Sequence, residues 1–443
     1  MKSTTALKGV AVLGVATLAL AACSSSGTTA ASSSAPAPAS SAAAPSMAPS
    51  ASAASTAAAC QTTTLTIGSL LPETGDLAFL GPPEFAGVQK ALNEINAAGG
   101  VNGAEIVYIK GDSGDTSTDI ASQTVDSALS QGANAIIGAA SSGVSLTVID
   151  KITGNGVVQM SPANTSPALT TYDDKGLYFR VAPSDVLQGA IIASTAIDKG
   201  IESMAVIARQ DAYGEGLADA AAKNFEAGGD TVTEKILYDP AATSFEAEVA
   251  KIKAGKPAAV TVIGFEESVK LLQEMIKQGV GPQDVQVFLV DGNISTEAYK
   301  DFPKGTMKGV IATVPSGEKD LTAFNESLKE VDPNLTDFAY GAQSYDATNL
   351  IALAAQAAGC ADGTAIAAKL PDVAGNGGEK CENFADCLAL LQAGTDIDVE
   401  GVTGPLDFNQ YGDPATATIS INEYSSNTEF AETGKVTAEV PLP

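Results

Sequence analysis

Two serines, Ser141 and Ser142, follow an apolar segment at 133–138 and stand directly before a helical pattern. A hydroxyl group and the free backbone N–H groups at the start of a helix are suited to binding a carboxylate. A serine at such a place also commonly serves as a plain N-cap, and both interpretations stay open. Ala163 and Thr165 follow the next apolar segment, where a backbone group and a hydroxyl could complete the same grip. The pattern therefore predicts a carboxylate-binding place at the ends of two neighbouring strands.

An acidic residue, Asp291, follows the apolar segment 285–290 and is predicted to lie at the carboxyl end of a strand, facing the same place. Phe265 and Tyr213 are predicted to form aromatic walls beside it. Each has a plainer interpretation: Asp291 as a turn residue, Phe265 as core packing and Tyr213 as the cap of a surface helix. For the adjacent glutamates at 266–267, a solvated helix start is favoured, with entry into the site as the alternative.

The amino-acid composition argues against several kinds of chemistry. The chain of 443 residues contains no His and no Trp. Without His there is no Ser–His or Cys–His nucleophile and no imidazole ligand for a metal. The sequence also lacks a Walker A motif, a G-x-G-x-x-G turn after a strand and a G-x-S-x-G elbow. We therefore expect a protein that is not an enzyme and that holds no metal or other cofactor.

The charge of the chain bears on its partners. The formal net charge is −28 at pH 7, from 52 acidic and 24 basic residues. A chain of this charge is repelled by phosphate backbones and by anionic lipid headgroups. We therefore expect no nucleic-acid partner.

Short apolar segments of strand length alternate with helical patterns in two successive series. The predicted strands lie at 64–71, 105–110, 133–138 and 157–160 in the first series, and at 204–208, 231–237, 258–264 and 285–290 in the second. Repeated βα units with apolar strands predict a parallel, doubly wound sheet that is covered on both faces. Two such series predict an α/β protein made of two similar lobes.

The N-terminus has the features of a secretory signal. Lys2 and Lys8 precede an apolar segment at 9–22 that has signal-peptide length and is short for a membrane span. Small residues directly before Cys23 resemble a lipobox, which predicts a signal peptide at 1–22 and acylation of the Cys23 thiol. An ordinary secretory signal, cut at the same place, is the alternative. The favoured interpretation places the protein on the extracytoplasmic face of the cell membrane, attached by a lipid anchor.

A segment of low complexity follows this cysteine. Residues 24–59 are almost entirely Ser, Ala, Thr and Pro, without apolar periodicity. Such a composition cannot bury enough apolar surface to offset the entropy of the chain. We therefore predict that residues 23–61 are the lipidated cysteine and a disordered linker.

Four further cysteines are present: Cys60, Cys360, Cys381 and Cys387. An even number in an exported protein suggests disulfides, and four cysteines allow three pairings. The proximity of Cys381 and Cys387 in sequence favours a bridge between them, which leaves Cys60 to pair with Cys360. The spacing has no CxxC unit, so we expect no metal bound by these residues.

Several short motifs resemble one known family in their order and spacing. Over roughly residues 63–425 the chain is similar to type 1 periplasmic binding proteins, and more closely to the leucine/isoleucine/valine-binding proteins of ABC transporters. The motifs lie at 70–75 (LLPETG), 94–103 (EINAAGGVNG), 137–138 with 141–143, 160–165 (MSPANT), 179–185 (FRVAPSD), 212–216 (AYGEG), and 404–408 (GPLDF) with 412–413.

The resemblance implies an architecture and a set of partners. It implies two doubly wound lobes joined by a hinge, with the ligand in the cleft at the carboxyl ends of the strands. Lobe 1 would comprise residues 62–183 and 316–404, and lobe 2 residues 184–315 and 405–443. It further implies a monomer that binds a small molecule and delivers it to ABC permease subunits.

The resemblance also implies roles for single residues. The positions that match Ser142, Ala163 and Thr165 hold the α-carboxylate of the ligand in this family. Asp291 matches the acidic position that binds the ammonium group, with Asp where Glu is common, and Phe265 matches an aromatic position. These matches imply that the ligand is an amino acid of the branched-chain kind.

This sequence departs from the family pattern at two places. Leu80 stands where an aromatic residue lines the first loop, although Phe79 could substitute for it, and the family's cysteine ahead of the serines is absent. Binding of an amide, urea or an aromatic acid is therefore an alternative. A ligand-sensing lipoprotein that serves no transporter is another.

Overall fold

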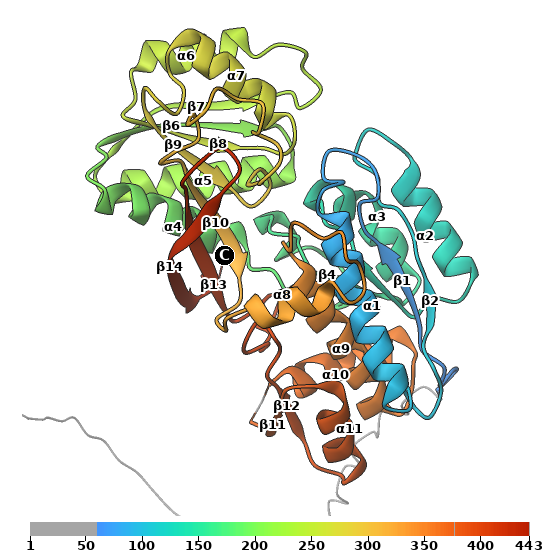
Figure 1. The fold of residues 1–443 in the computed structure, drawn as a ribbon. Coiled ribbons are helices and arrows are strands. Elements are labelled where there is room, and N and C mark those ends of the chain that lie inside the picture. The colour runs from blue at the N-terminus through green and yellow to red at the C-terminus, as the bar shows by residue number, and fades with distance from the viewer. Residues whose placement is uncertain (1–59, 376, 443) are drawn as a thin grey trace, which may run out of the picture. The chain divides into compact units, whose positions relative to one another are not determined.

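The computed structural model describes residues 60–375 and 377–442 (Figure 1). The predicted signal peptide at 1–22, the acylation of Cys23 and the linker up to residue 59 lie outside the described residues. Within the described part, strands and helices alternate along most of the chain. The predicted α/β fold is therefore confirmed.

The sheet of the first lobe has five strands, all parallel, in the order β2-β1-β3-β4-β5. They are β1 (Thr66–Leu70), β2 (Val107–Ile109), β3 (Ala135–Gly138), β4 (Val158–Ser161) and β5 (Tyr178–Arg180). Every residue of β1, β3 and β4 is buried, because helices cover both faces of the sheet. In β3, Ile136 packs toward one group of helices and the next residue, Ile137, packs toward the other.

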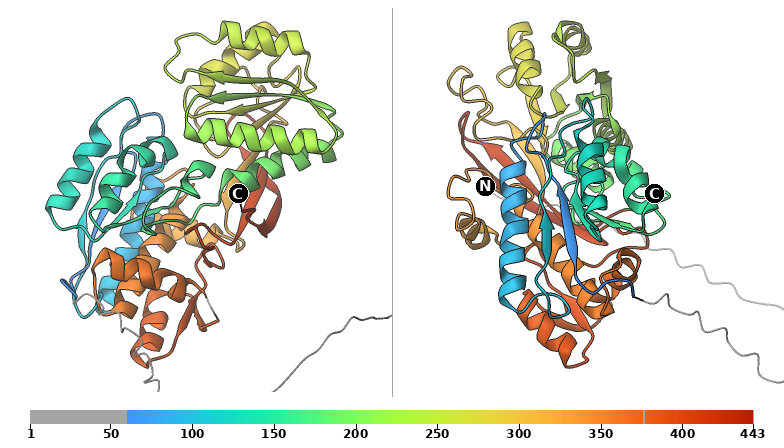
Figure 2. Two further views of the ribbon diagram at one scale, coloured as in Figure 1. Left: turned by 180° about the vertical axis from the view of Figure 1, so that it is seen from behind. Right: turned by 90° about the vertical axis from the view of Figure 1, so that its right-hand side faces the viewer.

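Helices α2 (Ile120–Ser130) and α3 (Ser142–Gly154) cover one face of this sheet, and α1 (Gly81–Ala97) lies on the other (Figure 2, right). The face with α1 is completed by a later part of the chain. That part contains α8 (Thr322–Leu328), α9 (Gly341–Ala358), α10 (Gly363–Ala374), α11 (Phe384–Gln392) and the short strands β11 (Glu379–Cys381) and β12 (Ile397–Val399). In the part of the chain that the structure describes, no single helix is long and apolar enough to cross a membrane, and only α9 and α10 reach that limit as a pair bent by 105°.

Helices α1 and α9 approach each other closely at two glycines. A Cβ atom added to Gly87 would lie 2.1 Å from the carbonyl oxygen of Gly341. No residue larger than glycine fits at position 87 unless the helices move apart. The pair therefore sets how deeply α9 packs against the first lobe.

The sheet of the second lobe has seven strands in the order β14-β13-β10-β9-β8-β6-β7. Five are parallel: the four that were predicted, β6 (Ser203–Arg209), β7 (Thr231–Tyr238), β8 (Ala259–Ile263) and β9 (Gln286–Val290), and one that was not, β10 (Ile311–Ser316). The sequence pattern gave no strands in the C-terminal tail, where β13 (Thr416–Tyr424) and β14 (Phe430–Glu439) pair antiparallel. They extend the sheet beyond β10.

Helices cover both faces of this second sheet as well (Figure 1). One face carries α4 (Asp185–Asp198) and α5 (Ala212–Ala227), and the other carries α6 (Glu246–Gly255) and α7 (Ser268–Gln278). The strands between them are almost completely buried, which explains their continuous apolar sequences.

The chain passes between the two lobes three times, at 181–184, 317–321 and 400–415. A fully buried ion pair links the first and third of these crossings. Arg180, at the end of β5, donates to both carboxylate oxygens of Asp413, from Nε at 2.6 Å and from Nη2 at 2.7 Å. Such a bidentate pair holds the two crossing segments in a fixed relation. The lobe boundaries that the resemblance implies stay a prediction.

Two disulfides are present in the structure, Cys60–Cys360 and Cys381–Cys387, which are the two expected pairings. The second connects the end of β11 to α11. The first joins residues 300 positions apart, at the start of the described chain and just beyond the end of α9.

Candidate ligand-binding site

One cavity lies where the carboxyl ends of strands from both lobes meet. Seven of the eight predicted ligand-binding residues line it: Leu80, Ser142, Ala163, Thr165, Tyr213, Phe265 and Asp291. Leu77, Ala140, Gly292 and Tyr340 complete the lining, which contains no Lys or Arg. The sequence-predicted residues are thus brought together, although they come from widely separated parts of the chain.

The eighth predicted residue, Ser141, is not part of the lining, and its structural role is that of an N-cap. Its Oγ accepts a hydrogen bond from the backbone N–H of Val144 at 3.4 Å, at the start of α3. The two interpretations of the serine pair therefore apply to different residues. Ser141 caps the helix, and Ser142 lies at the cavity.

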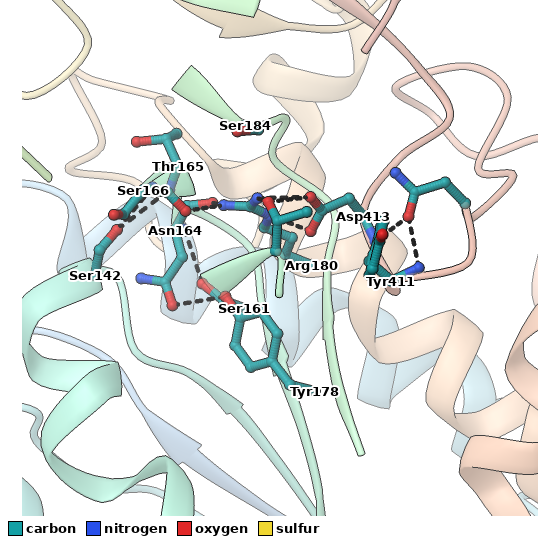
Figure 3. A network of polar contacts seen from close by, with 12 residues as sticks. Ser142, Ser161, Asn164, Thr165, Ser166, Tyr178, Arg180, Ser184, Tyr411 and Asp413 are labelled. Carbon is teal, nitrogen blue, oxygen red and sulfur yellow. Dashed lines mark hydrogen bonds and ion pairs between the residues drawn. The ribbon is translucent and has the colours of Figure 1, made fainter. Parts of the chain in front are cut away.

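Ser142 is the first residue of α3 and is 2% exposed. Its Oγ accepts hydrogen bonds from the backbone N–H groups of Thr165 at 3.3 Å and Ser166 at 3.2 Å (Figure 3). A serine hydroxyl that accepts in this way still has its own proton to donate. Ser142 therefore holds the loop after β4 in place and can also donate to an anion.

The loop after β4 is held by buried polar contacts from several sides (Figure 3). Ser161 Oγ accepts from the backbone N–H groups of Ala163 at 3.2 Å and Asn164 at 2.8 Å. Tyr178 donates to the Asn164 side chain at 2.9 Å, and Arg180 donates to the carbonyl oxygen of Asn164 at 3.2 Å. Because the N–H of Ala163 is already used, its carbonyl oxygen is the backbone group that it can offer to a ligand.

Asp291 lies at the turn after β9, and its side chain is 5% exposed. Oδ1 accepts from Gln188 Nε2 at 2.8 Å and from the Tyr213 hydroxyl at 3.1 Å, and Oδ2 accepts from the Tyr340 hydroxyl at 2.8 Å. Burial raises the pKa of the Asp291 carboxyl, while the hydrogen bonds from Gln188, Tyr340 and Tyr213 act in the opposite direction. Asp291 is therefore a turn residue by backbone and a cavity residue by side chain.

The aromatic residues form a stacked pair beside Asp291. The rings of Tyr213 and Phe265 lie 5.3 Å apart between centroids, with 17° between their planes. The guanidinium group of Arg209 lies 3.6 Å from the centroid of the Phe265 ring. The cap of α5 is Asp211, which accepts from the N–H of Gly214 at 2.9 Å, so Tyr213 does not serve as the cap.

Glu267 contradicts the prediction of a solvated helix start. It is 9% exposed and accepts from Arg209 Nη1 at 3.1 Å and from the Tyr238 hydroxyl at 2.8 Å. It also does not enter the cavity. The prediction fails because Arg209, its partner, lies 58 residues earlier in the sequence, on β6. Glu266, by contrast, is exposed as expected.

Sequence reasoning missed three residues at or near the site. Tyr340 lines the cavity from the start of α9, where it adopts a left-handed backbone conformation with φ 60°. Gln188 and Asp185 come from α4. Burial and then the nearby charge of Asp291 raise the pKa of the Asp185 carboxyl well above its usual range. Tyr340 and Gln188 follow no strand, and Asp185 follows β5, which the sequence pattern did not predict, so the strand-end pattern could not find them.

Leu80 is 2% exposed and lines the cavity from the residue before α1, whereas Phe79 is not in the lining. The departure from the family pattern at this position stays a prediction. Leu80 gives this part of the cavity an aliphatic lining.

The chain is similar to known proteins of one family. The pattern of the family described as "Periplasmic binding protein" matches residues 64–416. The chain is 30% identical to the Leu/Ile/Val-binding protein homolog 1 of Brucella abortus over 310 residues, which is 68% of this chain and 80% of that one.

Two solved structures share the fold. One is the branched-chain amino acid transporter substrate-binding protein LivJ of Streptococcus pneumoniae in complex with isoleucine, at TM-score 0.67 and 22% identity, covering 85% of this chain and 99% of that one. The other is an ABC transporter solute-binding protein of R. palustris in complex with benzoate, at TM-score 0.67 and 18% identity, covering 84% and 96%. On the evidence of the matched residues, the chain belongs to the periplasmic binding protein family and is a solute-binding protein of the branched-chain amino acid transporter type.

Proposed function

We propose that this protein binds a free α-amino acid with an aliphatic side chain in the cavity between its lobes and delivers it to the permease of an ABC importer. The observation that carries the proposal is the composition of that cavity. Hydroxyl donors from the first lobe, on Ser142 and Thr165, stand in the same cavity as the carboxylate of Asp291 from the second lobe. An amino acid offers a carboxylate to the donors and an ammonium group to the acceptor.

The carboxylate end is formed by the start of α3 and the loop after β4. The positive end of the α3 dipole and the hydroxyl groups of Ser142 and Thr165 favour a negative charge there. No Lys or Arg lines the cavity. The negative charge of the ligand carboxylate must therefore be stabilised by these hydrogen-bond donors and by the helix dipole.

The ammonium end is formed by Asp291 together with the carbonyl oxygen of Ala163. We expected Ala163 to help hold the carboxylate, but its N–H is occupied by Ser161. A carbonyl oxygen accepts hydrogen bonds and therefore suits the ammonium group. This assignment moves Ala163 to the other end of the ligand.

The choice between an amino acid and an aromatic acid follows from Asp291. A ligand such as benzoate has a carboxylate and no hydrogen-bond donor, so it would bring a second negative charge toward Asp291 in a cavity without a cation. An amino acid would instead pair its ammonium group with that residue. The remaining lining, Leu77 and Leu80 with the Tyr213 and Phe265 rings, is suited to an aliphatic side chain.

The lobes touch each other across the site, so a ligand requires them to separate before it enters. The cavity volume is about 10 Å³, space for roughly one water molecule. Contacts between the lobes at its edge include the Tyr340–Asp291 hydrogen bond and one from Ser166 Oγ to the carbonyl oxygen of Ala212 at 2.6 Å. Bending at the three crossings would break these contacts and open the cleft.

We further propose that Cys23 is acylated and holds the protein at the extracytoplasmic face of the membrane. The proposal rests on the sequence pattern around that residue. Mass spectrometry of the mature protein from cells would show an N-terminal Cys23 that carries lipid, and Cys23→Ala would release the protein from the membrane fraction. A mature chain that begins elsewhere, or a membrane-bound Cys23→Ala variant, would contradict the anchor.

The ligand is tested by calorimetric titration of protein that has been unfolded and refolded to remove carried-over molecules. The panel comprises the proteinogenic amino acids, urea, short amides and aromatic acids. We expect one-to-one binding of aliphatic amino acids. Binding of an aromatic acid or an amide, with no response to any amino acid, would overturn the assignment of Asp291.

A further inference from the structure

A second cavity adjoins the candidate site and shares Tyr340 with it. We name it the adjoining cavity. Its volume is about 240 Å³, much larger than the space at the candidate site. It is lined by parts of both lobes: residues 314–316 of β10 and Ser420 of β13 from the second, and Asn325 of α8 and residues 336–340 from the first.

Two buried polar atoms of this cavity lack a hydrogen-bond partner in the part of the chain that the structure describes. Ser316 Oγ and Asn325 Oδ1 are buried, and neither has a hydrogen-bond partner among the described residues. The carboxylate of Asp337 accepts hydrogen bonds from backbone N–H groups, including that of Ala339 at 2.9 Å. Buried polar atoms left unpaired are costly, which makes them a sign of a missing ligand group.

The remaining lining decides which ligand fits. It contains the carboxylate of Asp337 and no Lys or Arg, so its charge favours a cation over an anion. Val314, Phe338 and Phe430 supply an apolar surface. The net charge of −28 adds a long-range attraction for cations.

We propose that the adjoining cavity is a second binding site, which takes a small primary amine with an apolar body. The ammonium group donates to Asp337, Asn325 and Ser316, and the apolar body packs against Val314 and the two phenylalanines. This site is separate from the amino-acid site, and the proposal does not depend on what the candidate site binds.

An occupant of the adjoining cavity contacts both lobes at once. It therefore favours the arrangement in which the lobes are close together over any arrangement that separates them. Tyr340 also connects the two sites directly, because its hydroxyl donates to Asp291 at 2.8 Å while its side chain lines both cavities.

The test is calorimetric titration of phenethylamine into the purified protein and three variants. Asp337→Asn removes the charge in the adjoining cavity, and Asn325→Leu removes a polar partner at similar size. Asp291→Asn removes the acidic group of the candidate site, the other place where an amine could bind. Thermal unfolding of each variant establishes that it is folded.

We expect phenethylamine to bind the wild type and also the Asp291→Asn variant with one-to-one stoichiometry, because that variant keeps Asp337, Asn325 and Ser316. We expect at least roughly tenfold weaker binding to Asp337→Asn, because a charge-assisted hydrogen bond is lost, and weaker binding to Asn325→Leu. The proposal is wrong if phenethylamine does not bind the wild type at millimolar concentration. It is equally wrong if Asp337→Asn binds like the wild type, or if binding is lost only in Asp291→Asn.

Discussion

Asp291 accepts hydrogen bonds from three side chains in separate parts of the chain: Gln188 of α4, Tyr213 of α5 and Tyr340, which directly precedes α9. Three neutral donors stabilise a buried carboxylate and leave its negative charge available to a ligand. Among the described residues that line the cavity, Asp291 alone carries a charge, and it contacts both lobes. The affinity for an amino acid should therefore depend strongly on this one side chain.

Replacing Asp291 with Ala should weaken amino-acid binding by about 1.5–3 kcal/mol, which is roughly tenfold or more, because a buried charged hydrogen bond is removed. Calorimetric titration with the preferred amino acid measures the loss. Glu266→Gln serves as the control, since it removes an exposed negative charge one residue from Phe265. Equal affinities for wild type and Asp291→Ala would refute the ammonium assignment.

The two adjacent serines should separate binding from stability. Ser142→Ala should weaken amino-acid binding by on the order of 1–3 kcal/mol, because a donor to the carboxylate and the acceptor for two loop N–H groups are both lost. Ser141→Ala should lower the unfolding free energy by about 1 kcal/mol through the lost N-cap and leave affinity nearly unchanged. Titration and denaturant unfolding of both variants distinguish these effects, and the reverse pattern would exchange the two roles.

At the scale of elements, α1 and α9 come from opposite ends of the first lobe's sequence and meet at Gly87 and Gly341. The contact fixes the start of α9, and Tyr340 is the residue directly before that helix. The packing of α1 against α9 therefore helps to position the Tyr340 hydroxyl group that donates to Asp291.

Gly87→Ala should destabilise the protein by about 1–3 kcal/mol, because the added methyl group overlaps the Gly341 carbonyl. Gly154→Ala is the matched control: no atom lies within 4 Å of the added Cβ, and the residue is the last of α3. Chemical denaturation of both variants measures the difference. A Gly87→Ala protein as stable as the Gly154→Ala protein would show that the helices separate at little cost.

The secondary-structure elements also show how much of the fold and of the candidate site the sequence alone predicts. Apolar segments predicted most of the parallel strands, although not β5 or β10. The site residues that follow predicted strands were found because the carboxyl ends of parallel strands meet at one edge. Gln188 lies within α4 and Tyr340 directly before α9, where no such rule applies. The polar alternation of β14 resembles an exposed surface, since one face of that strand is open to solvent. The burial of Glu267 depends on Arg209, a distant partner that local sequence does not reveal.

At the scale of the whole molecule, the excess of acidic residues and the burial of several of them both make the free energy of unfolding fall as the pH rises. Burial raises the pKa of Glu84 well above its usual range and raises that of Asp346 to about 6. A carboxyl whose pKa is higher in the folded than in the unfolded state holds its proton more tightly when folded. The free energy of unfolding therefore falls as the pH rises from the unfolded pKa through the folded one. Repulsion within a chain of charge −28 adds to this fall.

The midpoint of thermal unfolding should thus be higher at pH 5.5 than at pH 8. Glu84→Gln should reduce this difference, because both oxygens of Glu84 are buried without a partner among the described residues and the variant cannot ionise. Glu105→Gln, at an exposed position, should leave it unchanged. A midpoint that rises from pH 5.5 to pH 8 would mean that other groups outweigh these acids.

The disulfide between Cys60 and Cys360 determines which part of the fold bears a pulling force applied to the chain ahead of Cys60. Strand β1 begins six residues after Cys60 and lies between β2 and β3 in the sheet. A pull on the chain ahead of Cys60 is carried by a covalent bond to the end of α9, which packs across the first lobe, and so cannot peel β1 out of its sheet. The first lobe bears the load as one body, and the second lobe remains free to move under tension. Reducing this one bond would transfer the load to β1, at the centre of the lobe that carries Ser142 and Thr165.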